Sequence, residues 1–552
     1  MKVIRRAVQA GLVVMVAVSA AFAQSLGDAR KAMDAEQYQQ AKTILKKLIA
    51  SQPAAGENYF FLGNVYLKTD YRDSAKATYS KGVSASAEYP LNYVGLGTLD
   101  LLAKNQASAK SNFDKAISLT KKKDNSAYLY IGKAYTLAKD YTTALANLEK
   151  AKAINEKDAE VYLFMGDAYI GDKKNSEAYS AYRTAFDMDK NLLRAKIELG
   201  KSVRRSKAFK ESADEFNAIL ASNANYAPAY RELAETYYEW AKDQPNEYNA
   251  RIKQALEYYG KYMDNTDRSL DSRMRYADFL VLAGEYKALE QEAQQMAQSG
   301  QSNPRIYRYL GYAAFENGHF AESVKALKDF ISKVEAERVI AQDYFYLGRA
   351  QLKSEDTSGV STLAKAVSID SAYAEPLSEL AKEQFTAKKY ELAAKLYELA
   401  VSNESSKTVI YDNFYLGMAY YFDYAGKDAA TQKSRKDILV KADSAFSYVA
   451  QKSPTTPDSY LYRARVNRLL DDDQNSKGMM VPYYEKYVEV LSAKPETMAD
   501  PRYKKNLAEA YNNIGAYYMR TNHGKAKEYF SKTIALDPGN TYAAEALKSL
   551  SN

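Results

Sequence analysis

Residues 128–148, YLYIGKAYTLAKDYTTALANL, and residues 162–182, YLFMGDAYIGDKKNSEAYSAY, contain the pattern that decides the fold. In each stretch an aromatic residue precedes a glycine by four positions, and another follows it by three. The second half of each stretch then places a large residue four positions after an alanine. Spacings of three and four residues put side chains on one face of an α-helix, so each stretch predicts two helices joined by a turn.

The same pattern recurs at a nearly constant interval. A small residue that follows Leu, Ile or Met appears at places 34 or 35 residues apart, namely Gly63, Gly97, Gly132, Gly166, Gly200 and Ala234. A small residue lets two antiparallel helices approach closely. One such pair cannot bury its apolar face alone, so the period predicts a stack of pairs that share a continuous core.

This pattern resembles the tetratricopeptide repeat, whose W-x2-L-G-x2-Y and A-x3-F groups recur every 34 residues. Similar frames recur at Ala277, Gly311, Gly348, Ala381, Gly417, Ala464 and Gly515, so the resemblance covers nearly the whole chain after residue 23. It implies an all-α protein, an α-solenoid of about 13–14 helix-turn-helix repeats that form a right-handed superhelix with a concave side. The 552 residues also exceed what one hydrophobic core can span.

The repeat interval lengthens at several places. Extra residues lie between Tyr237 and Ala255, in Asp423–Arg435, in Asp471–Gly478 and in Ala493–Pro501. Insertions in solenoids map to loops, often on a binding face, so we expect loops there.

These interruptions divide the chain into blocks. We expect a regular repeat block over residues 24–240, a central block over 241–400 and an irregular block over 401–552 that ends in a cap helix at Tyr542–Leu550.

The amino terminus predicts export. Lys2, Arg5 and Arg6 precede an uncharged run that ends in Ala21-Phe22-Ala23, which is typical of a signal peptide over residues 1–23 cleaved after Ala23. Because the chain has no Cys, an N-terminal lipid anchor is excluded, and we expect a soluble periplasmic protein that is not a lipoprotein. Cleavage removes three positive charges and lowers the net charge from +8 to +5, too little to favour nucleic acid.

The composition leaves little catalytic chemistry. There are no Cys, and the two His, His319 and His523, fall in turns of different repeats. No Gly-rich phosphate loop, HExxH or G-x-S-x-G motif is present. We therefore expect no enzyme activity, no cofactor and no metal site.

The resemblance implies that positions 2, 5, 9 and 12 of each first helix line the concave groove. Near the N-terminus these positions are apolar, as at Phe60, Leu67 and Val94, and in the middle of the chain they are basic and aromatic. The candidate protein-binding residues are Arg194, Lys201, Arg204, Arg205, Arg231, Tyr238, Arg305, Arg308, Tyr312, Arg349, Phe414 and Tyr421. Arginines beside rings suit an acidic or carboxylate-ended peptide. The alternative that stays open is that these arginines form ion pairs within the chain.

Three functions compete at this stage. The first is a periplasmic scaffold or adaptor that binds envelope proteins or peptide segments through its concave groove, within an outer-membrane-associated complex. The second is a glycan- or peptidoglycan-binding protein, since tyrosine rings stack on sugars. The third, an enzyme, is least favoured because the repeats leave no room for a catalytic domain. The identity of the partner and homo-oligomerisation are left open.

Overall fold

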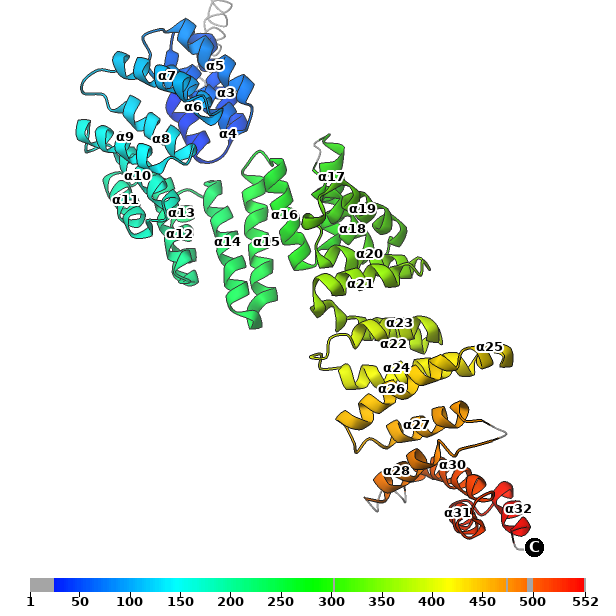
Figure 1. Cartoon of the computed structure of the whole chain (residues 1–552). Coiled ribbons are helices and arrows are strands. Elements are labelled where there is room, and N and C mark those ends of the chain that lie inside the picture. Colours follow the sequence, from blue (N-terminus) through cyan, green and yellow to red (C-terminus); the bar gives the residue numbers. More distant parts are fainter. Residues whose placement is uncertain (1–23, 301–302, 473–474, 494–499, 551–552) are drawn as a thin grey trace, which may run out of the picture. The chain divides into compact units, whose positions relative to one another are not determined.

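The computed structural model describes residues 24–300, 303–472, 475–493 and 500–550. Over these ranges the chain forms α-helices and short 3-10 turns and contains no strand. The signal-peptide prediction falls on residues 1–23, which lie outside the described residues. The chain divides into two compact units, one ending at Ser302 and one beginning at Asn303 (Figure 1). The three repeat blocks expected from the sequence stay a prediction.

The first unit consists of eight helical hairpins among its described residues. Each first helix packs against the second helix that follows it, and neighbouring hairpins pack in turn. The helices are α2 Leu26–Asp34, α3 Tyr38–Ser51, α4 Gly56–Lys68, α5 Arg72–Ala85, α6 Leu91–Leu102, α7 Gln106–Leu119, α8 Ser126–Leu137, α9 Tyr141–Ile154, α10 Ala159–Gly171, α11 Asn175–Met188, α12 Leu193–Arg205, α13 Phe209–Ser222, α14 Ala227–Asp243, α15 Tyr248–Asp264, α16 Leu270–Ala283 and α17 Tyr286–Gln298.

The second unit continues the same arrangement with six hairpins and a final helix among its described residues. The helices are α18 Arg305–Glu316, α19 Phe320–Lys333, α20 Ala341–Lys353, α21 Gly359–Ile369, α22 Leu377–Thr386, α23 Tyr390–Ala400, α24 Val409–Ala425, α25 Ala429–Ser434, α26 Lys436–Lys452, α27 Pro457–Leu470, α28 Val481–Ser492, α30 Pro501–Tyr518, α31 His523–Leu536 and α32 Thr541–Ser549. The all-α solenoid is confirmed, as is the C-terminal cap helix, which is α32.

The repeating glycines are where paired helices approach most closely. A Cβ atom on Gly166 of α10 would lie 2.4 Å from a ring carbon of Tyr182 on α11. At Gly97 and Gly132 the obstructing side chains are Phe113, at 2.5 Å, and Leu148, at 2.6 Å. The large residue of the second helix therefore fills the space that the glycine leaves, as the spacing predicts.

Most hairpins of the first unit also share one backbone conformation in the turn between their two helices. In six of the first seven hairpin turns, a non-glycine residue adopts a left-handed backbone conformation with φ between 59° and 65°. These residues are Glu36, Asp70, Lys104, Lys139, Lys173 and Lys207. Glycine takes the same role at Gly284 and Gly318, where it carries no Cβ penalty. The turn is thus a second periodic feature of the fold.

The first insertion is not a loop, which corrects the expectation from the sequence. The extra residues lengthen α14 and α15 to 17 residues each, joined by the short 3-10 helix η1, Pro245–Glu247. Trp240 stacks on Phe209 with ring centroids 6.2 Å apart, and the Arg251 guanidinium lies 4.0 Å from the Trp240 ring centre. This packing makes a longer hairpin more favourable than an exposed loop.

The second insertion is not a loop either, because its residues extend α24 and form a further helix, whereas the third does lie between helices. The second insertion forms the short helix α25 between α24 and α26. The third follows α27, where the Asp471 carboxylate accepts hydrogen bonds from backbone N–H groups of Asp472, Lys477, Gly478 and Met479. The fourth, in Ala493–Pro501, falls mainly on residues 494–499, outside the described ranges.

Candidate functional site

Four of the five basic residues predicted to line the groove of the first unit carry acidic partners from the same chain. Arg194 Nη2 lies 2.6 Å from Asp167 Oδ2, and Lys201 Nζ lies 2.8 Å from Glu198 Oε2. Arg204 Nη1 lies 2.9 Å from Glu232 Oε2. Arg194, Lys201 and Arg204 therefore form ion pairs within the chain, which was the alternative left open by the sequence. That these residues bind a protein stays a prediction.

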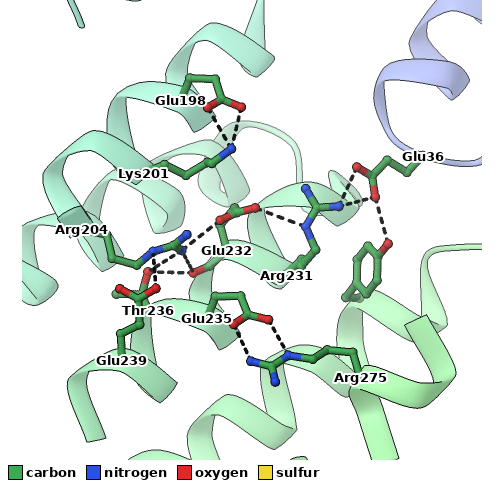
Figure 2. A network of polar contacts seen from close by, with 11 residues as sticks. Glu36, Glu198, Lys201, Arg204, Arg231, Glu232, Glu235, Thr236, Glu239 and Arg275 are labelled. Carbon is green, nitrogen blue, oxygen red and sulfur yellow. Dashed lines mark hydrogen bonds and ion pairs between the residues drawn. The ribbon is translucent and has the colours of Figure 1, made fainter. Parts of the chain in front are cut away.

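The Arg204–Glu232 pair belongs to a network that continues through Arg231 to Glu36, and Figure 2 shows it beside the pairs Glu198–Lys201 and Glu235–Arg275. Glu232 is buried and accepts from Arg204 and also from Arg231 Nε at 3.2 Å. Burial raises the pKa of Glu232, but the charges of Arg231 and Arg204 outweigh it and leave that pKa below its usual value. Glu235 binds the guanidinium of Arg275 through both oxygens, at 2.6 and 2.8 Å. The middle of this face is thus electrostatically balanced.

Arg231 is held by the first hairpin of the unit. Its Nη1 lies 2.6 Å from both carboxylate oxygens of Glu36, which is 195 positions away in sequence. Figure 2 shows Glu36 reaching Arg231 from another helical segment. Repeats distant in sequence therefore meet within the first unit.

The second unit has a comparable buried pair. Arg308 binds Asp343 through two parallel hydrogen bonds of 2.8 and 2.7 Å, and Tyr312 donates to the same carboxylate at 2.7 Å. Asp343 is completely buried, and these donors and the Ile340 backbone N–H compensate its charge. Two predicted site residues, Arg308 and Tyr312, thus stabilise the fold.

The remaining predicted residues contact rings or stay exposed. Arg349 lies between the rings of Phe315 and Phe345, at 4.4 and 5.2 Å. Arg205 is exposed and donates weakly to Ser202 at 3.4 Å. Tyr238 lies under Arg275, Arg305 donates to Tyr309, and Phe414 and Tyr421 both pack on Tyr462.

A small apolar cavity opens on the first helices of the first unit. It measures about 50 Å³ and is lined by Phe60, Asn64, Leu67, Val94, Thr98, Tyr130, Lys133, Ala134 and Leu137. Leu137 is 53% exposed, although leucine is normally buried. The sequence predicts Phe60, Leu67 and Val94 on the groove, and the structure brings these three side chains together in the lining of this cavity.

Lys133 is the cation of this cavity. Its ammonium lies 4.8 Å from the ring centre of Phe164 and 5.7 Å from that of Tyr130, and no ion pair reaches it among the described residues. The side chain is exposed, and desolvation by the neighbouring protein with the positive charge of Arg194 lowers the pKa of Lys133 to about 8, although the nearby carboxylates Glu160 and Asp167 act in the opposite direction. An ammonium group without an ion pair, beside apolar side chains, attracts an anion.

The family comparison matches two segments of the chain. Residues 56–89, which contain α4 and α5, and residues 159–192, which contain α10 and α11, match the tetratricopeptide repeat. These two hairpins are similar to tetratricopeptide repeats. Such repeats generally bind protein partners, which supports an interaction scaffold.

Solved structures also match parts of the chain. The C-terminal part of a tetratricopeptide repeat-containing protein from Cytophaga hutchinsonii is 27% identical over 50% of this chain and 98% of its own, with a TM-score of 0.30. PilF of Pseudomonas aeruginosa is 17% identical over 42% and 100%, with a TM-score of 0.34. A tetratricopeptide repeat protein from Parabacteroides merdae is 14% identical over 45% and 93%, with a TM-score of 0.31. No curated protein matches the chain.

The repeat frame also explains which residues sequence reasoning missed. Glu198 and Glu232 are 34 positions apart and each stands two residues before the small residue of its repeat, so their shared role was visible in the period. Lys133 directly follows Gly132 and was visible in the same way. Glu36 was not, because its partner lies in a distant repeat.

The two histidines lie where the sequence placed them. His319 precedes α19 as its N-cap residue, and His523 begins α31. Within the described ranges, no group of three His, Cys, Asp or Glu side chains is arranged to hold a metal ion. Nor does any helix in those ranges combine the length and the apolar character needed to cross a membrane.

Proposed function

We propose that this protein is an exported scaffold that binds proteins of the cell envelope in the periplasm, as part of an outer-membrane-associated complex. The tetratricopeptide repeats support the scaffold role, and the signal-peptide pattern of residues 1–23 supports export. The partner docks on the first helices α4, α6, α8 and α10 of the first unit.

One observation carries the proposed site. The cavity around Leu137 combines exposed apolar surface with Lys133, a cation that has no carboxylate of its own. Apolar surface that the core does not require is costly to leave in water, and an exposed ammonium without an ion pair is free to receive a carboxylate. A peptide segment with an apolar side chain next to a carboxylate satisfies both needs.

The basic middle of the groove is a weaker docking site. Arg194, Arg204 and Arg231 already carry carboxylates, so a ligand must displace an internal ion pair there before it gains a new one. Binding at Lys133 requires no such exchange.

No specific observation favours the glycan alternative. Sugar stacking needs exposed rings in one plane. Tyr411 is 39% exposed, but its neighbour Tyr415 is half-buried and inclined at 41° to it.

Site-specific cross-linking in intact cells tests the proposal. A photo-reactive amino acid at position 137 should capture a defined set of envelope proteins, and Lys133→Glu should abolish that capture because it repels the carboxylate. A matched probe at Met188, an exposed residue of the second helix α11, should not capture the same set. Equal capture from positions 137 and 188, or capture that survives Lys133→Glu, contradicts the proposed site.

Cell fractionation tests the location independently. The mature protein should appear in the periplasmic fraction with Gln24 as its first residue. A cytoplasmic protein that begins at Met1 contradicts the export proposal.

A further inference from the structure

The turn between α2 and α3 docks against a part of the first unit nearly 200 residues away. Tyr226 donates a hydrogen bond to Asp34 at 2.9 Å, and Tyr262 donates to Glu36 at 2.9 Å. Arg231 binds both oxygens of Glu36 at 2.6 Å, as Figure 2 shows. The two carboxylates of one turn thus meet three donors from α14, α15 and the residue before α14.

Those three donors form a site whose shape does not depend on the turn alone. Tyr226 and Tyr262 are 2% and 8% exposed, so packing fixes the direction of their hydroxyls. Arg231 is oriented from its other side by Glu232 at 3.2 Å. We call Tyr226, Arg231 and Tyr262 the acid notch. Without the turn, the donors of the acid notch would lack the carboxylates of Asp34 and Glu36. Another carboxylate that enters the notch would replace these acceptors.

The neighbours of the turn add polar contacts to the docking, and Ala35, between the two acids, packs against the apolar cluster that contains Ile197 and Tyr226. The Gln39 backbone N–H donates to Asp267 at 2.8 Å, and the Gln37 amide donates to the Asn265 carbonyl at 3.3 Å. The side chains of Arg231 and Glu36 remain 30% and 20% exposed.

The first hairpin also has packing of its own beside this docking. The first hairpin buries its apolar residues Ala41, Ile44 and Leu45 in a core shared with α4. In a solenoid each repeat is stabilised mainly by its neighbours.

We propose that the Asp34–Glu36 turn is a built-in occupant of the acid notch, and that the notch accepts an acidic Asp-x-Glu turn of a partner protein when this occupant is released. The inference rests on the proposed function as a scaffold and adds a second docking site with a defined ligand chemistry. The specificity of the acid notch is set by the spacing of the two carboxylates, which have one residue between them.

A peptide-binding measurement on the full mature chain tests this inference. The probe is a fluorescein-labelled peptide of residues 31–40, KAMDAEQYQQ, read by fluorescence anisotropy. The released chain carries Asp34→Asn and Glu36→Gln, which weaken the internal occupant but leave the notch intact. The closed chain carries Gln39→Cys and Asp267→Cys joined by a short bismaleimide, and these are its only thiols because the natural chain has no Cys.

The released chain should bind the peptide at least tenfold more tightly than the wild type, and the closed chain should not bind it. A control peptide with Asn and Gln in place of its two acids should lose binding at least tenfold. Adding Tyr226→Phe and Tyr262→Phe to the released chain, which keeps the rings and removes only the hydroxyls, should also lower affinity at least tenfold. Amide exchange of α2 should be faster in the released chain than in the wild type.

Equal binding by the acidic and amide peptides, or a released chain that binds no better than the closed one, overturns the inference. Unchanged exchange of α2 in the released chain also overturns it, because the turn is then not held by these bonds. Capture from position 137 concerns a different set of residues, so its loss overturns the proposed function while the peptide result judges only the notch.

Discussion

A glycine-to-alanine substitution at Gly166 tests the packing rule that builds every repeat. A Cβ atom at this position would lie 2.4 Å from Tyr182 Cε1, and Tyr182 is 1% exposed and donates to Asp167 at 3.0 Å. The ring therefore cannot move aside easily. Overpacking of this kind costs about 1–3 kcal/mol, while alanine gains about 1 kcal/mol over glycine inside a helix. We expect Gly166→Ala to lower the free energy of unfolding by about 1 kcal/mol.

Gly260 is the matched control because it also lies inside a helix, α15, but faces open space. The nearest atom to a Cβ there is 4.0 Å away. Gly260→Ala should therefore raise the free energy of unfolding by about 1 kcal/mol through helix propensity alone. The two substitutions are chemically identical, so opposite signs isolate the steric contact.

A double-mutant cycle sharpens the test. In a Tyr182→Ala background the obstructing ring is absent, so Gly166→Ala should become stabilising by about 1 kcal/mol. The assay is chemical denaturation of the full chain, with amide exchange of α10 and α11 to follow the local effect. Stabilisation by Gly166→Ala in the wild type, or an unchanged sign in the Tyr182→Ala background, refutes the reasoning.

Three further predictions concern single residues. Lys173→Gly should raise the free energy of unfolding by about 0.5 kcal/mol in denaturant titrations, because Lys173 has φ of 62° and glycine relieves that strain at some entropic cost; a loss of stability contradicts this. Asp471→Asn should destabilise the chain by about 2 kcal/mol at pH 7, because hydrogen bonds lower the folded-state pKa of Asp471 from 3.8 to about 2. The stabilisation from this carboxylate is complete above pH 5 and is lost as the pH falls towards 2, so the stabilities of the wild type and the variant should converge in acid. A stability difference that does not change with pH argues against this explanation. Arg308→Leu should lower the free energy of unfolding by about 3 kcal/mol because it leaves the buried Asp343 carboxylate without its cation. The double variant Arg308→Leu/Asp343→Leu should regain most of this stability in thermal melting, and a double variant as unstable as Arg308→Leu would contradict the prediction.

Local spacing was enough to predict the hairpins, because their contacts join residues about 16 positions apart. Gly166 meets Tyr182 and Gly200 meets Phe216, and both pairs are visible in the period of the sequence. The extended hairpin α14–α15 was not predicted. Its extra turn is stabilised by Arg251 over Trp240, a contact that no repeat rule contains.

The candidate site was predicted in part. The sequence identified arginines on the first helices, whose place on a groove stays a prediction, and it could not say that Glu232 and Asp343 compensate Arg204 and Arg308. The apolar positions near the N-terminus were recognised without the significance of Lys133 among them. The docking of Glu36 on Arg231 depends on how many repeats complete a turn of the solenoid, which local pattern does not encode.

The central claim is that a partner protein binds at the Lys133 cavity, and affinity measured on a purified captured partner tests it most directly. Lys133→Glu should weaken the Kd at least tenfold, since it reverses the charge that receives the partner's carboxylate. Lys150→Glu is the control, because Lys150 also stands over a tyrosine ring, that of Tyr128, but lies on the second helix α9. We expect Lys150→Glu to leave the Kd unchanged. Equal loss in both variants, or no loss in Lys133→Glu, would contradict the account.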